Sequence, residues 1–113
     1  MPYISVQTSQ AVSAGTQEQL IARFGKGIEI LPEKTEQWLM VDIKENQTLA
    51  FAGESGNTAF VQVMLYGDNT SEIYALFTAK ATEIVSELLS ISPDRIYVAY
   101  FPTPYWGWNG ENF

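Results

Sequence analysis

The chain has 113 residues, with thirteen acidic against six basic side chains and a net charge of −7. Hydrophobic residues make up 46% of it, which predicts a single folded domain over residues 1–113. The negative charge argues against nucleic acid or an anionic membrane as the main partner. The absence of cysteine excludes disulfides and thiol nucleophiles, and without histidine as well we expect no transition-metal site.

The first chemical feature is Pro2, which follows Met1 and precedes an alternating strand predicted over residues 3–8. A small second residue usually allows removal of the initiator methionine, so we expect the mature chain to begin with Pro2 as a secondary amine. An α-amino group titrates near pH 7.7–8.0, and apolar surroundings or a nearby cation lower its pKa. Pro2 is therefore a candidate base. The alternative is a proline that only opens an edge strand, where its missing N–H costs nothing.

A helix is predicted over residues 16–31. Thr16 and Gln19 fit a capping box, and Pro32 stands where a helix should stop. Gly25 and Gly27 weaken the second half of this helix, since each costs about 1 kcal/mol relative to alanine. The apolar residues return at helical spacing and are Leu20, Ile21, Phe24, Ile28 and Leu31.

The rest of the chain repeats this order. Strands are predicted over residues 38–43 and 59–66, with a shorter one over 49–51 between them. A strongly amphipathic helix with apolar residues from Ile73 to Leu89 follows, and then a strand over residues 95–101. No linker separates the two β-α-β units, so they predict an α/β pseudo-repeat within one domain.

The strands have two different faces. Two helices could cover the aliphatic face, formed by Ile4, Val6, Leu39, Val41, Ile43, Val61, Val63, Leu65, Ile96 and Val98. The opposite face is large and partly apolar, with Tyr3, Ser5, Gln7, Trp38, Met40, Phe60, Gln62, Met64, Tyr66, Tyr97, Ala99 and Phe101. An uncovered patch of that size marks an interface, so we expect an oligomer whose sheets face each other. The alternative is a monomer with an exposed sheet face.

Three separated motifs carry a family resemblance. They are Met1-Pro2, the ISPDRIY stretch at residues 91–97, and GWNG at residues 107–110 followed by Phe113. In register over the whole chain, these motifs resemble the macrophage migration inhibitory factor (MIF) family of the tautomerase superfamily. The resemblance implies an α/β (α+β) fold with a four-stranded mixed sheet and two helices on one face. It also implies a homotrimer, with a pocket at each subunit boundary that holds the N-terminal proline.

The implied activity is keto–enol tautomerisation of α-keto acids such as phenylpyruvate, with Pro2 as general base and without a metal or organic cofactor. The main rival is a cytokine or signalling protein that binds a receptor or host protein and keeps a vestigial tautomerase site. A related dehalogenase or decarboxylase is a weaker alternative. Those reactions usually need additional arginines around the proline, and here only Arg23 and Arg95 are present.

The resemblance also implies binding residues for the substrate carboxylate. Lys34 matches the family's lysine beside that group, and its charge would also disfavour a protonated proline. The residues alone favour a solvated turn lysine beside Glu33 and Glu36 over a ligand for the substrate. Tyr66 stands where the family presents a backbone N–H to the carboxylate, and its bulky side chain would narrow the pocket.

The remaining site residues are aromatic. Tyr97 matches a pocket tyrosine that an adjacent subunit contributes, with an ordinary strand tyrosine as the alternative. Trp106, Trp108 and Phe113 resemble the family's aromatic rim, where an aryl group would stack, and trimer packing is their alternative role. Ala99 replaces an asparagine that hydrogen-bonds hydroxyphenyl substrates, so a preference for that group is not expected.

The family's cysteine pair is also missing, because the corresponding stretch over residues 57–60 reads NTAF; we therefore do not expect the associated thiol-oxidoreductase activity. The connection over residues 101–105 is shorter than in animal members, which would remodel one pocket wall. The N-terminus lacks the basic and apolar regions of a secretory signal. We therefore expect a cytoplasmic protein, with export without a signal peptide as the alternative.

Overall fold

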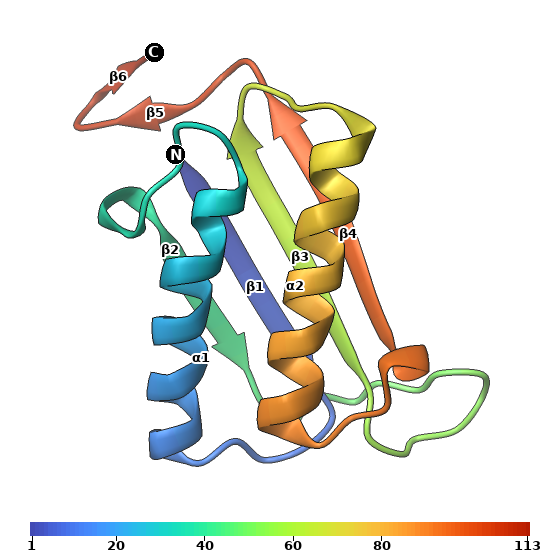
Figure 1. Cartoon of the computed structure of the whole chain (residues 1–113). Helices are drawn as coiled ribbons and strands as arrows, with labels where there is room; N and C mark the ends of the chain where they lie inside the picture. The colour runs from blue at the N-terminus through green and yellow to red at the C-terminus, as the bar shows by residue number, and fades with distance from the viewer.

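The computed structural model describes residues 1–113 and contains two β-α-β units that share one sheet (Figure 1). In the first unit, β1 (Pro2–Thr8) and β2 (Met40–Lys44) are parallel and joined through α1 (Ala14–Gly27). In the second, α2 (Ser71–Leu89) joins the parallel strands β3 (Ala59–Tyr66) and β4 (Ile96–Thr103). β1 and β3 pair antiparallel, which gives the order β2-β1-β3-β4. The predicted mixed sheet with both helices on one face is confirmed (Figure 1).

The ends of α1 differ from the prediction. The N-cap is Ser13, whose Oγ accepts a hydrogen bond from the N–H of Thr16 at 3.2 Å. The predicted capping box of Thr16 and Gln19 is therefore wrong. The α-helix stops at Gly27 and continues as the 3-10 turn Ile28–Ile30. A Cβ at Gly27 would lie 3.3 Å from Cγ of Lys80 on α2, so this glycine permits a close approach of the two helices.

Three strand boundaries also differ. Trp38 lies in the 3-10 turn Glu36–Trp38, and β2 begins only at Met40. Residues 49–51 form no strand, and Phe51 makes only an isolated bridge to Glu54. Arg95 belongs to the 3-10 turn Pro93–Arg95, while β4 continues to Thr103, beyond its predicted end. At Trp38 and Arg95, 3-10 turns replace the predicted extended backbone, and β2 and β4 begin only after them.

The chain ends in a small hairpin that the alternation did not predict. β5 (Gly107–Trp108) pairs antiparallel with β6 (Glu111–Asn112) across Asn109 and Gly110, both with positive φ. An Asn-Gly pair with this backbone is the preferred two-residue hairpin turn, so these two residues were the available signal. The hairpin lies at the same end of the sheet as the N-terminus (Figure 1).

The two sheet faces differ in burial as predicted. On β3 the side chains of Val61, Val63 and Leu65 are fully buried under the helices, while the intervening residues are only partly buried. On the open face, Met40 and Tyr97 are 66% and 62% exposed. The core therefore lies between the sheet and the helices, and the other face has no covering layer in a single chain. No helix is long and apolar enough to cross a bilayer.

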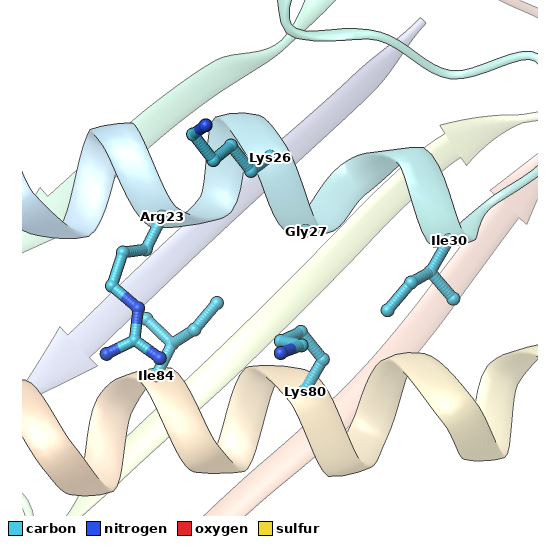
Figure 2. A pocket seen from close by; sticks show the side chains of 6 residues that line it. All are labelled: Arg23, Lys26, Gly27, Ile30, Lys80 and Ile84. Atoms are coloured by element: carbon cyan, nitrogen blue, oxygen red, sulfur yellow. The ribbon is translucent and has the colours of Figure 1, made fainter.

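A cavity of about 270 Å³ lies between α1 and α2 and is lined partly by the cations Arg23, Lys26 and Lys80 (Figure 2). Arg23 reaches from α1 towards α2, where its guanidinium lies 2.6 Å from Glu87 and 3.6 Å from Glu83. Lys80 lies 3.4 Å from Glu83 on the same helix. Two of the three cations are therefore already paired with carboxylates, and the pairs of Arg23 join the two helices. Exposed ion pairs of this kind contribute at most about 1 kcal/mol to stability.

Candidate active site

Pro2 begins β1 and is buried, opposite Leu65 near the end of β3. The preceding carbonyl of Met1 accepts a hydrogen bond from the N–H of Tyr66 at 3.0 Å, which continues the antiparallel ladder by one step. The N-terminus is therefore fixed by sheet pairing rather than free in solution. This fixed position is what a terminal amine needs if it is to act on a bound molecule.

Two adjoining cavities surround the N-terminus. The first, of about 470 Å³, is lined by Met1, Glu33, Lys34, Trp38, Tyr66, Trp108 and Phe113. The second, of about 370 Å³, includes Pro2 and Trp106 and shares Met1, Trp38 and Trp108 with the first. Six of the seven predicted site residues thus meet at one end of the sheet: Pro2, Lys34, Tyr66, Trp106, Trp108 and Phe113.

Lys34 is the only basic side chain that lines either cavity. The backbone of Glu33 has a φ of +65°, which turns the chain after α1, and the N–H of Lys34 donates to the carbonyl of Leu31 at 3.1 Å. The ammonium donates to the backbone carbonyl of Tyr66 at 3.0 Å and forms no ion pair. A half-buried lysine without a carboxylate partner can bind an anion, despite the negative charge of the whole chain.

Aromatic contacts hold the C-terminal hairpin over this site. The rings of Trp38 and Trp108 meet edge to face with centroids 5.1 Å apart, and those of Tyr66 and Phe113 lie 5.4 Å apart. The N–H of Phe113 also donates to the carbonyl of Trp106 at 3.0 Å. Each ring pair joins one residue of the tail to one of the preceding chain, so the cavity walls depend on the tail.

Trp38 is a lining residue that the sequence analysis missed. Its place in an alternating run put it on the open sheet face, whereas the 3-10 turn Glu36–Trp38 rotates it into both cavities. Glu33 was considered only as a neighbour of Lys34, yet it lines the larger cavity. No pattern in the sequence predicts this placement, because residues 31–35, which include Lys34 and precede the turn, belong to no regular element.

The terminal amine is electrostatically perturbed. Burial, and then the positive charge of Lys34 close by, lower the pKa of the Met1 α-amino group from 8.0 to about 6. Both effects disfavour the charged form of an amine. An amine at this position is therefore mostly neutral at pH 7, which is the state that a base requires.

Tyr97, the seventh predicted site residue, lines neither cavity. It pairs with Phe60 on β3, whereas Pro2 pairs with Leu65, five residues further along that strand. At the rise of a β-strand this offset is roughly 17 Å, so Tyr97 cannot contact Pro2 of its own chain. Its expected contribution to a neighbouring subunit's site stays a prediction.

The mixed sheet with both helices on one face, together with the buried proline at position 2, indicates a protein of the tautomerase superfamily. The sequence model of the family described as "Macrophage migration inhibitory factor (MIF)" matches residues 1–113. The chain therefore belongs to the MIF family, and the resemblance of its motifs is confirmed.

Individual relatives are distant in sequence and close in structure. The macrophage migration inhibitory factor of Meriones unguiculatus is 26% identical over 115 residues, covering 100% of this chain and 99% of that protein. The crystal structure of Leishmania major MIF2 superposes with a TM-score of 0.93 at 26% identity, covering 100% of this chain and 97% of that one. The homologue from Prochlorococcus marinus gives a TM-score of 0.89 at 26% identity, covering 98% of each chain.

Proposed function

We propose that this protein, starting at Pro2 after removal of Met1, is an enzyme that interconverts the keto and enol forms of phenylpyruvate-like α-keto acids. The observation that carries the proposal is the half-buried N-terminus beside Lys34, which forms no ion pair, because an amine at this place is mostly neutral near pH 7. The same burial and the same cation would act on the Pro2 amine once it becomes the terminus. Pro2 is then a general base that needs no metal or organic cofactor.

Removal of Met1 would also create a carboxylate site. In the full chain the N–H of Tyr66 is occupied by the carbonyl of Met1. Without Met1 this N–H becomes free, next to the ammonium of Lys34, which uses one of its three donors on the carbonyl of Tyr66. Two donors directed at one place can hold a carboxylate and offset the charge of a developing enolate.

The proposed reaction moves one proton between carbon and oxygen. The neutral nitrogen of Pro2 removes a proton from the carbon next to the ketone, and the C–H electron pair forms the carbon–carbon double bond of the enol. The carbonyl electron pair moves to the ketone oxygen, which takes a proton from water, and the prolinium returns its own proton to water, so that the neutral amine is restored. Trp108, Phe113 and Trp38 provide apolar walls for the phenyl ring, in a cavity within the usual size range of small-molecule sites.

We further propose that the active form is a homotrimer. The open sheet face, with Met40 and Tyr97 more than half exposed, supports burial against other copies of the chain. Within one chain, Tyr97 and Pro2 are offset by roughly 17 Å along β3, which supports a site that another subunit completes. The proposed location is the cytoplasm, with export without a signal peptide as the alternative.

The experiment is a turnover assay on untagged protein whose N-terminus at Pro2 is verified by mass spectrometry. We expect decay of the phenylpyruvate enol absorbance, and loss of most of this activity in Pro2→Gly with an unchanged circular dichroism spectrum. Gly15→Ala, on α1 where an added Cβ meets no atom within 4 Å, is the control and keeps full activity. Undiminished turnover in Pro2→Gly would refute the mechanism. No turnover in the wild-type chain would leave the signalling role as the remaining candidate.

A further inference from the structure

A tight turn fixes the backbone of Phe51 although no strand runs through it. The N–H of Phe51 donates to the carbonyl of Glu54 at 2.9 Å, and the N–H of Glu54 donates back at 3.0 Å. Ala52 and Gly53 between them have φ angles of +54° and +77°. Positive φ at both central residues is the geometry of the two-residue hairpin turn. Residues 51–54, called here the Phe51 turn, therefore form a small closed unit within a long loop.

Arg95 joins the Phe51 turn to the start of β4. Its guanidinium donates to the carbonyls of Asn57, Glu54 and Gly56 at 2.8, 3.2 and 3.3 Å. It also lies over the ring of Phe51, 5.4 Å from the centroid. Arg95 makes no ion pair with any carboxylate. Arg95 stands two residues before Tyr97, so its hydrogen bonds hold the loop close to that tyrosine.

The ring of Phe51 contacts the ring of Tyr97, with centroids 5.0 Å apart and planes inclined by 57°. Tyr97 is nevertheless 62% exposed, and its hydroxyl makes no hydrogen bond within the chain. An exposed tyrosine ordinarily exchanges between rotamers, whereas a packed neighbouring ring selects one of them. The chain thus orients Tyr97 without using its hydroxyl, which leaves that group available to another molecule.

We propose that Phe51, held by Arg95, is a positioning residue that presents Tyr97 to the active site of a neighbouring subunit. The inference rests on the proposed function of Pro2. Within its own chain Tyr97 is too far from Pro2 to contact a substrate bound there, so the site that it completes belongs to another subunit. Fixing the ring before assembly removes an entropic cost that a free side chain would incur on entering the site. The free energy of such an aromatic contact corresponds to about a 2- to 10-fold change in kcat/KM.

The first test is a double-mutant cycle on chains that begin at Pro2. We expect Phe51→Ala to lower kcat/KM for phenylpyruvate by about 2- to 10-fold, and Phe51→Tyr to retain it because a ring remains. In a Tyr97→Phe background, Phe51→Ala has no further effect, since the hydroxyl that it positions is gone. Leu76→Ala, an exposed apolar residue on α2, is the matched control and changes nothing. Additive losses from Phe51→Ala and Tyr97→Phe would overturn the proposal.

The second test mixes subunits. Pro2→Gly and Phe51→Ala chains are unfolded together and refolded, so that random trimers form. About one quarter of the sites then combine an intact Pro2 with an intact Phe51 from the neighbour, and activity rises above that of the two proteins refolded separately. No rise means that Phe51 acts within its own chain, which contradicts the proposal while leaving the tautomerase intact. An inactive wild type refutes the proposed function and the inference with it. Should Phe51→Ala fail to fold, Phe51→Leu replaces it in both tests.

Discussion

The terminal amine should be a weaker base than an ordinary one by about two pKa units. In a chain that retains Met1, the pKa of the α-amino group is lowered from 8.0 to about 6. At pH 7 an amine with a pKa near 6 is about nine-tenths neutral, against about one-tenth for an amine with a pKa near 8. The site therefore provides roughly ten times more neutral base at physiological pH than an unperturbed terminus would.

The two causes of this shift can be separated by removing Lys34. Burial is the largest cause, followed by the charge of Lys34 and then by a hydrogen bond from Lys34. Lys34→Met keeps most of the apolar stem and removes the charge, so we expect the pKa of the amine to rise while remaining below 8.0. Lys26→Met, an exposed lysine on α1 that lines neither cavity at the N-terminus, is the matched control and leaves the pKa unchanged.

The measurement is competitive acylation of the α-amine between pH 5 and pH 9, on chains expressed with and without inhibition of methionine aminopeptidase. The chain beginning at Pro2 should show a lowered pKa for the same reasons.

The shift also predicts the pH dependence of stability. The folded amine binds fewer protons than the unfolded one between about pH 6 and pH 8, so stability falls as pH falls through that window. A pKa of 8 or above in the wild type, or a full return to 8.0 in Lys34→Met, would refute this account.

Three further results are expected. Lys34→Ala raises the KM for phenylpyruvate more than it changes kcat, because the lysine binds a carboxylate that is present in both the ground state and the transition state. Steady-state kinetics that show an effect on kcat alone would contradict this. Trp38→Ala removes the edge contact to Trp108 and raises the KM for phenylpyruvate about 2- to 10-fold, with a smaller effect on an aliphatic α-keto acid. Ser90→Gly stabilises the chain by up to about 1 kcal/mol in urea unfolding, because Ser90 ends α2 with a φ of +56°; a destabilised variant would show that its side chain contributes more than its backbone strain costs.

Local patterns predicted much of the fold because they report local requirements. The alternation Val61, Val63 and Leu65 predicted a strand with one buried face, and all three side chains are fully buried. The boundaries were less well predicted, because turns compete with strands over only one or two residues. Ser13 rather than Thr16 caps α1 for this reason, since both are good capping residues and only the backbone geometry selects between them.

By itself, the sequence determined the two β-α-β units, the unequal faces of the sheet, and a set of residues whose motifs indicate a proline-based site. Only the tertiary structure decided which of these residues meet. Trp38 and Trp108 are far apart along the chain and come into contact because a 3-10 turn and an Asn-Gly hairpin face each other. The register of the sheet, in turn, separates Tyr97 from Pro2. Periodicity reports which side of an element is buried, whereas contacts between distant segments depend on register and turn geometry, which arise only when the whole sheet forms.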